Sequence, residues 1–221
     1  MKSPIRNFTI TSLALCALLA GVAQVRAANV QVAVDPGQTW IGFMNVFNLP
    51  ADGGAFVFNG AWGTADLRAA FSGSTLTLSP NTNVYNPTDP FWVKPSGDGN
   101  KSMDANFYVQ NDSLAGVTLN FVGIVAANTL SGPYTSVAFI KDFVPNYSSS
   151  TSAIVPLTPG FFSLTLATAP GDHIQYGFEM VGPDANPLTA DSLGSVVVVP
   201  EPCSLALLGL GFLGAMVWRR R

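Results

Sequence analysis

The chain has 221 residues, of which 48% are hydrophobic and only 10% are charged, and its formal net charge at pH 7 is −3. Residues 28–199 hold four basic residues against twelve acidic ones. A segment with so few cations cannot neutralise a phosphate backbone, which excludes nucleic acid as a partner and argues against adhesion to an anionic membrane face.

Residues 1–27 have the organisation of a secretory signal peptide. Lys2 and Arg6 give a positively charged start, residues 10–23 are apolar, and small residues at positions 25 and 27 suit signal peptidase. The apolar run is shorter than the ~20 residues that a membrane-spanning helix needs. We therefore predict cleavage after Ala27 and export of the rest of the chain.

Neither cysteine remains in the predicted exported domain, residues 28–195. Cys16 lies in the signal peptide and Cys203 lies in the C-terminal tail. An exported domain without a disulfide must be stabilised by its hydrophobic core, and a chain of this length can bury about 70% of its unfolded surface.

Apolar and polar residues alternate along the exported domain, which is the pattern of strands with one buried face. The segments with this pattern are residues 29–34, 75–78, 103–111, 117–125, 136–143, 160–168 and 173–180. Clusters of Gly and Pro separate them and can reverse the chain. Residues 64–71 fit a turn of helix or a strand equally well, and the Ser-rich residues 146–153 are expected to form a solvated loop. We predict an all-β fold, an antiparallel β-sandwich or jelly roll.

The domain offers little catalytic chemistry. His173 is the single histidine of the chain, and no Gly-x-Ser-x-Gly motif accompanies it, so neither a Ser-His-Asp triad nor a zinc site is expected. Most aspartates lie in turns, where their side chains bond to the nearby backbone, so a glycosidase with paired carboxylates is the least favoured function. We predict that the protein is not an enzyme.

One polar segment is a weak candidate for calcium binding. In the sequence DGNKSMD, Asp98, Asn100, Ser102 and Asp104 occupy alternate positions, as the oxygen ligands of a calcium loop do. The sixth position is methionine instead of glycine and the twelfth is valine instead of glutamate, so the segment is not an EF-hand. The alternative is a strand entry whose polar residues face water. We expect no other cofactor.

Trp62 and Trp92 lie beside turn residues and are candidates for a glycan-binding platform. Exposed aromatic rings on a β-sandwich can stack against sugar rings. The alternative is that these tryptophans and the fifteen phenylalanines of the chain fill a core that has no disulfide.

The tail has the properties of a membrane anchor. Residues 203–218 are sixteen residues without a charge, and a helix of this length spans ~24 Å, slightly less than the ~30 Å hydrocarbon core. Trp218 lies where an aromatic anchor would complete the crossing. Arg219, Arg220 and Arg221 then act as a stop on the cytoplasmic side.

Residues 196–221 resemble the PEP-CTERM sorting signal, with Pro200-Glu201-Pro202 followed by a Leu- and Gly-rich helix and an arginine cluster. The resemblance implies processing by an exosortase, a membrane-embedded cysteine peptidase of Gram-negative bacteria that is often encoded beside exopolysaccharide genes. A simple tail anchor is the alternative, but it has no need of Pro-Glu-Pro. Residues 40–67 resemble more loosely the ectodomains that such proteins carry, which have no assigned activity.

We therefore expect an exported protein that signal peptidase and an exosortase process. It passes through a transient inner-membrane stage and then lies at the cell surface or outside the cell. The predicted role is structural or interactive, and the alternative is a carbohydrate-binding module whose partner is an extracellular polysaccharide.

Overall fold

The computed structural model describes residues 27–201. Residues 1–26, Pro202, the predicted membrane helix and the arginines at 219–221 lie outside the described residues. The described part is all-β, with twelve strands, three short 3-10 helices and no α-helix, which confirms the predicted class. Over the same residues, no helix has the length and apolar character needed to cross a membrane.

The first sheet contains six strands, ordered β1-β7-β12-β5-β4, with β10 paired to β7. Their bounds are β1 Asn29–Ala33, β4 Ala69–Ser72, β5 Thr75–Leu78, β7 Thr118–Asn128, β10 Gly160–Ala167 and β12 Val196–Val199. The long strand β7 pairs with β1 through residues 118–122 and with β12 through residues 124–128. The first strand, β1, and the last strand, β12, therefore both pair with β7.

The second sheet also contains six strands, ordered β3-β2-β6-β11-β8-β9, and all its neighbours are antiparallel. Their bounds are β2 Ile41–Asn48, β3 Phe56–Trp62, β6 Lys101–Gln110, β8 Thr135–Phe143, β9 Ser150–Pro156 and β11 His173–Pro183. The 3-10 helices are η1 Pro50–Asp52, η2 Asp112–Leu114 and η3 Ala190–Leu193.

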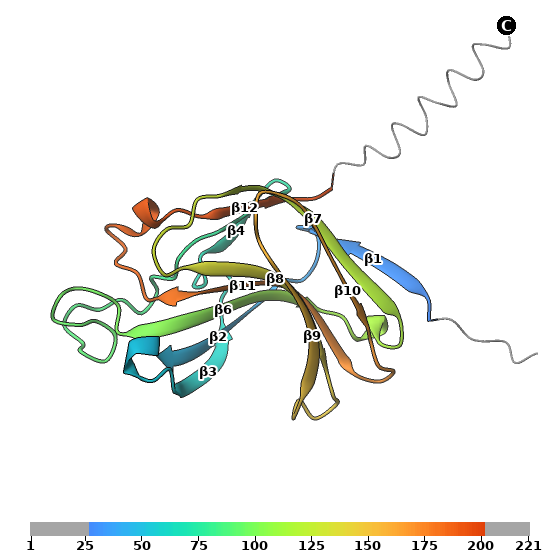
Figure 1. Ribbon diagram of the computed structural model, residues 1–221, viewed down its shortest axis with the longest axis horizontal. Coiled ribbons are helices and arrows are strands. Elements are labelled where there is room, and N and C mark those ends of the chain that lie inside the picture. The colour runs from blue at the N-terminus through green and yellow to red at the C-terminus, as the bar shows by residue number, and fades with distance from the viewer. Residues whose placement is uncertain (1–26, 202–221) are drawn as a thin grey trace, which may run out of the picture.

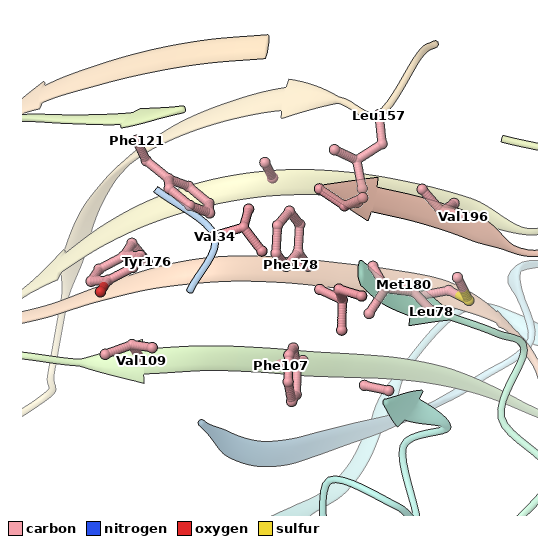
Figure 2. Packing of buried hydrophobic residues seen from close by; sticks show 14 of the residues in the cluster. Val34, Leu78, Phe107, Val109, Phe121, Leu157, Tyr176, Phe178, Met180 and Val196 are labelled. Atoms are coloured by element: carbon pink, nitrogen blue, oxygen red, sulfur yellow. The ribbon is translucent and has the colours of Figure 1, made fainter. Parts of the chain in front are cut away.

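The two sheets form two layers, and apolar side chains from both fill the space between them (Figures 1 and 2). Phe178 of β11 has no exposed surface, and its ring centroid lies 5.5 Å from that of Phe121 of β7. Trp40 stacks on Phe107 of β6 at 4.4 Å. Successive side chains of a strand point to opposite faces. The apolar residues of the alternating segments therefore all face one core.

Strands β2 and β3 lie in none of the segments that the alternation predicted. Three further features differ from the sequence-based expectation. The β1–β7 pair is parallel, although an antiparallel sandwich was expected. Residues 150–156, most of which were expected in a loop, form strand β9, because they pair with β8 and place Ala153 and Val155 against the core. Strand β12 lies beyond residue 195, yet Val196 and Val198 are completely buried, so the folded domain extends to the residue before Pro200.

Candidate functional site

The outer face of the second sheet, which points away from the core, carries polar and aromatic side chains. On β6, Ala105, Phe107 and Val109 point into the core, whereas Asn106 and Tyr108 point outward with their neighbours at alternate positions. The same alternation on β2, β8 and β11 brings outward side chains from four adjacent strands together.

A cavity of about 540 Å³ opens on this face. We call it the outer groove, and its lining residues are Phe43, Asn45, Asn59, Asn106, Tyr108, Gln110, Lys141, Phe143, Tyr147 and Gln175. Five of these ten residues are amides and four are aromatic. The groove therefore combines many hydrogen-bonding groups with flat apolar surfaces.

A hydrogen-bonded network fixes the polar side chains in the centre of the sheet. Asn45 Nδ2 donates to Asp104 Oδ2 at 3.0 Å, and Asn106 Nδ2 donates to Asp104 Oδ1 at 2.7 Å. Lys141 Nζ then donates to Asn106 Oδ1 at 2.8 Å and to Glu179 Oε2 at 3.0 Å. The network joins β2, β6, β8 and β11, so these side chains are held in place before any ligand arrives.

An aromatic cluster adjoins the outer groove, and two of its members, Phe143 and Tyr147, line it. Tyr147 has a positive φ of 56°, a conformation that a non-glycine residue rarely adopts, and the residue is 48% exposed. Its ring stacks on His173 at 4.5 Å and lies 5.6 Å from Phe143, and its hydroxyl accepts a hydrogen bond from Gln110 at 3.0 Å. Residues held in such conformations concentrate at functional sites, which makes Tyr147 a candidate contact residue.

His173 has a supporting position in this cluster. Its Nδ1 lies 2.7 Å from Asp112 Oδ2, and this hydrogen bond raises the pKa of the imidazole. The ring is parallel to that of Tyr147 within 8°. His173, the first residue of β11, therefore supports one face of the Tyr147 ring.

Gly177 of β11 is required beneath the outer groove. A Cβ at this position would collide with the Phe107 carbonyl oxygen and would lie 2.6 Å from Tyr108 Cα. Without that atom, the rings of Tyr108 and Phe139 approach to 6.5 Å across the face. The glycine thus leaves space for Tyr108, which lines the groove.

The Asp104 carboxyl has a perturbed pKa. Burial raises the pKa of Asp104 to about 6, and repulsion from the Glu179 carboxylate acts in the same direction. The hydrogen bonds from Asn45 and Asn106 and the positive charge of Lys141 act in the opposite direction. Asp104 therefore exchanges its proton in weakly acidic solution.

We expect the free energy of unfolding to fall as the pH rises from about 4 to about 6. The raised pKa of Asp104 accounts for part of this decrease. Over this range the folded protein keeps a proton on Asp104 that the unfolded chain, with a pKa near 3.8, has released. In Asp104→Asn this contribution is absent, so the stability of the variant relative to the wild type should rise with pH. Urea unfolding between about pH 4 and about pH 7 measures the difference.

Asp184, whose pKa burial raises to about 7, lowers stability over the same range in both proteins and cancels from the comparison. A difference between Asp104→Asn and the wild type that does not change with pH would contradict the assignment.

The candidate tryptophans lie away from the outer groove. Trp62 and Trp92 are partly buried and pack against the hydrophobic core. The ring of Trp92 also contacts Phe58 and Phe91, with centroid distances of 6.0 Å and 4.7 Å. Their positions are those of residues that contribute to the core.

The four candidate calcium ligands have separate partners. Asp98 Oδ2 accepts a hydrogen bond from Ser96, and Asn100 Nδ2 donates to the Pro90 carbonyl. Ser102 is buried on β6, and Asp104 belongs to the outer groove network. In the described residues 27–201, no three His, Cys, Asp or Glu side chains are grouped as metal ligands.

Sequence reasoning identified Asp104 as a candidate residue but not the amides and tyrosines around it. Residues 103–111 alternate between apolar and polar positions, and the positions that face away from the core include Asn106 and Tyr108. This alternation was the sequence feature from which the two residues could have been found. The other groove residues come from distant segments, and only the strand order brings them together.

The C-terminal motif follows the last strand without a spacer. Val199 of β12 pairs with Ile124 of β7, and Pro200 comes next. Glu201 Oε2 accepts a hydrogen bond from Gln31 Nε2 of β1 at 3.4 Å. Pro202 lies outside the described residues. The start of the motif is therefore positioned against the first sheet.

Residues 198–221 match a family model described as the PEP-CTERM protein-sorting motif. The chain carries a PEP-CTERM sorting signal. This confirms the resemblance seen in the sequence, and the signal implies an exported protein that an exosortase processes and that is anchored in the membrane by its C-terminal segment. Neither curated proteins nor solved structures give a match to the chain. The PEP-CTERM signal therefore identifies the sorting route, whereas the activity of the domain must be inferred from its own site.

Proposed function

We propose that the exported domain is a non-enzymatic β-sandwich that binds an extracellular polysaccharide through the outer groove, in the setting of exopolysaccharide production. The observation that carries the proposal is the combination of five amides and four aromatic side chains around one open cavity of about 540 Å³. A ligand site of this size needs a few fixed polar groups for orientation and apolar surfaces for contact area.

Sugar hydroxyls both donate and accept hydrogen bonds, and so do side-chain amides. Gln175 Nε2 donates to Gln110 Oε1 at 3.1 Å, which leaves further donor and acceptor positions on both side chains for a ligand. The exposed ring of Tyr147 offers a flat surface to the apolar face of a sugar. Because internal hydrogen bonds already hold these groups, less conformational entropy is lost on binding.

The charges near the outer groove favour a neutral polysaccharide. Lys141 is its single basic lining residue, and Glu179 forms an ion pair with it at 3.0 Å. Asp104 adds a nearby carboxylate. The positive charge of Lys141 is therefore already compensated. An anionic sugar would be repelled by the carboxylates of Glu179 and Asp104.

Binding of the full-length chain, purified in detergent, to a panel of neutral and anionic glycans tests the proposal. Tyr147→Ala should lower the affinity for the bound glycan at least tenfold, since it removes the exposed stacking surface. Phe161→Ala is the matched control, because Phe161 is 60% exposed but lies on β10 of the other sheet. Equal loss in both variants, or no binding to any glycan, would contradict the proposal.

A glycosidase is the second candidate, because Asp104 with its raised pKa lies near the carboxylate of Glu179. Both oxygens of Asp104 accept hydrogen bonds from amides, an arrangement that suits a fixed acceptor better than a proton donor. An enzyme of this kind would release reducing sugar ends from a bound glycan, and the variants Asp104→Asn and Glu179→Gln would lose this activity. That result would show catalysis in place of the proposed binding role.

A further inference from the structure

The loops 94–99 and 183–189 lie at the end of the molecule where β6 begins and β11 ends (Figure 1). Residues of both loops line a second cavity, also of about 540 Å³. We call it the loop cavity, and define it by residues 94, 96–99, 133–134, 183–186, 189 and 193, together with Leu49. It is separate from the outer groove and shares no lining residue with it.

One residue that lines the loop cavity, Asp184, has a buried carboxylate without a partner. Asp184 is only 1% exposed, and neither of its side-chain oxygens has a hydrogen-bond partner within residues 27–201. Leaving an ionised carboxyl buried and unpaired costs several kcal/mol. The charged form of Asp184 therefore needs a group that offsets its charge.

The backbone holds Asp184 firmly in this position. Its amide donates to the Lys101 carbonyl at 3.1 Å, and the next amide, that of Ala185, donates to the Asn81 carbonyl at 2.7 Å. Gly99 packs so closely that an added Cβ would collide with the Asp184 carbonyl oxygen. The main chain that carries the carboxylate is therefore fixed in place.

The nearby basic side chains have other partners. Lys94 Nζ lies 3.6 Å from Asp52 Oδ2. Lys101 Nζ donates to the Asn100 carbonyl at 3.3 Å and lies 4.5 Å from the centroid of the Phe91 ring. Among the ion pairs of the described residues, none includes Asp184. With no basic side chain paired to it, the Asp184 carboxyl is compensated either by a proton, since burial raises its pKa to about 7, or by a cation from outside the chain.

The donor atoms around the loop cavity are oxygens. Ser96, Asp98, Asn186 and Thr189 contribute side-chain oxygens, and the two loops add main-chain carbonyls. The lining contains no histidine, cysteine or methionine. Such a set suits a hard cation, and calcium accepts six to eight oxygens in irregular geometry, whereas magnesium demands a regular octahedron and usually keeps several waters.

We propose that the loop cavity binds Ca²⁺, with the Asp184 carboxylate as its buried anionic ligand and oxygens of the loops 94–99 and 183–189 as the others. Asp98, one of the four residues that the sequence suggested for calcium, lines this cavity, whereas Asn100, Ser102 and Asp104 do not. The ion would connect the two loops. Its dissociation constant is expected at about 10⁻⁴–10⁻³ M, as in other extracellular modules.

Thermal unfolding of the full-length chain in detergent, with and without CaCl₂ after EDTA treatment, tests the proposal. Calcium at about 100 times its dissociation constant should raise the Tm by about 5 °C or more, because it binds only the folded state. In Asp184→Asn the shift should vanish. Asp191→Asn is the matched control, since it removes one negative charge from a side chain that is 93% exposed, and it should keep the shift.

Terbium luminescence gives a second measurement that needs no variant. Tb³⁺ bound in the loop cavity should be sensitised by Tyr134, which lines it, and calcium should displace the signal. The proposal is overturned if calcium neither raises the Tm nor displaces terbium, or if Asp184→Asn keeps the full calcium shift. Glycan binding through the outer groove is measured separately and is not affected by either result.

Discussion

Replacing Glu201 by alanine is expected to leave the protein with its C-terminal segment attached in cells that contain an exosortase, whereas the wild-type chain loses that segment. Glu201 is the charged residue between the two prolines of the PEP-CTERM signal, and Pro200 comes two residues after Val198, the last strand residue that is buried in the core. The mass of the mature protein measures the result directly.

The matched control for this experiment is Gln31→Ala. Gln31 forms the hydrogen bond to Glu201 at 3.4 Å, but it is not part of the sorting signal. If Glu201 acts in recognition, Gln31→Ala is processed like the wild type. Normal loss of the tail in Glu201→Ala, or retention of the tail in the wild type, would contradict exosortase processing through this motif.

Replacing Phe178 by alanine is expected to destabilise the domain by about 3–5 kcal/mol. Phe178 has no exposed surface and packs against Phe121 and Phe162 of the first sheet, at centroid distances of 5.5 Å and 6.1 Å (Figure 2). The shortened side chain would leave a cavity between the two layers. Because domains of this kind are stable by only about 5–15 kcal/mol, the loss should appear as a large decrease in the midpoint of urea unfolding.

Leu188→Ala is the control for the core substitution. Leu188 is also a large apolar residue, but it is 91% exposed, so its replacement should change the free energy of unfolding by no more than about 0.5 kcal/mol. Similar midpoints for Phe178→Ala and Leu188→Ala would mean that the two layers do not pack as described.

The all-β class could be predicted from the alternation of apolar residues, and the seven segments with that pattern correspond to strands. Val117–Val125 overlaps β7 and His173–Met180 lies within β11, since each has one face in the core. Strand β9 was missed because its Ser-rich sequence resembles a loop, and its pairing with β8 depends on a distant segment. Strand β12 was missed because its four valines adjoin the sorting signal and do not alternate with polar residues.

The outer groove could not be predicted from local sequence. Asn45, Asp104 and Lys141 are up to 96 positions apart in the chain, and their common network exists because β2, β6, β11 and β8 are adjacent in one sheet. The burial of Asp184 likewise depends on the contact between its loop and Gly99. In the sequence it is one aspartate among several in turns.

The sequence alone determined the sorting signal and the fold class of this protein, because a Pro-Glu-Pro motif and alternating strands are both encoded by neighbouring residues. Only the tertiary structure decided which polar residues share a surface and which carboxylate is buried. Strand order and loop contacts join segments that are far apart in the chain, and neither follows from the residues of any single segment.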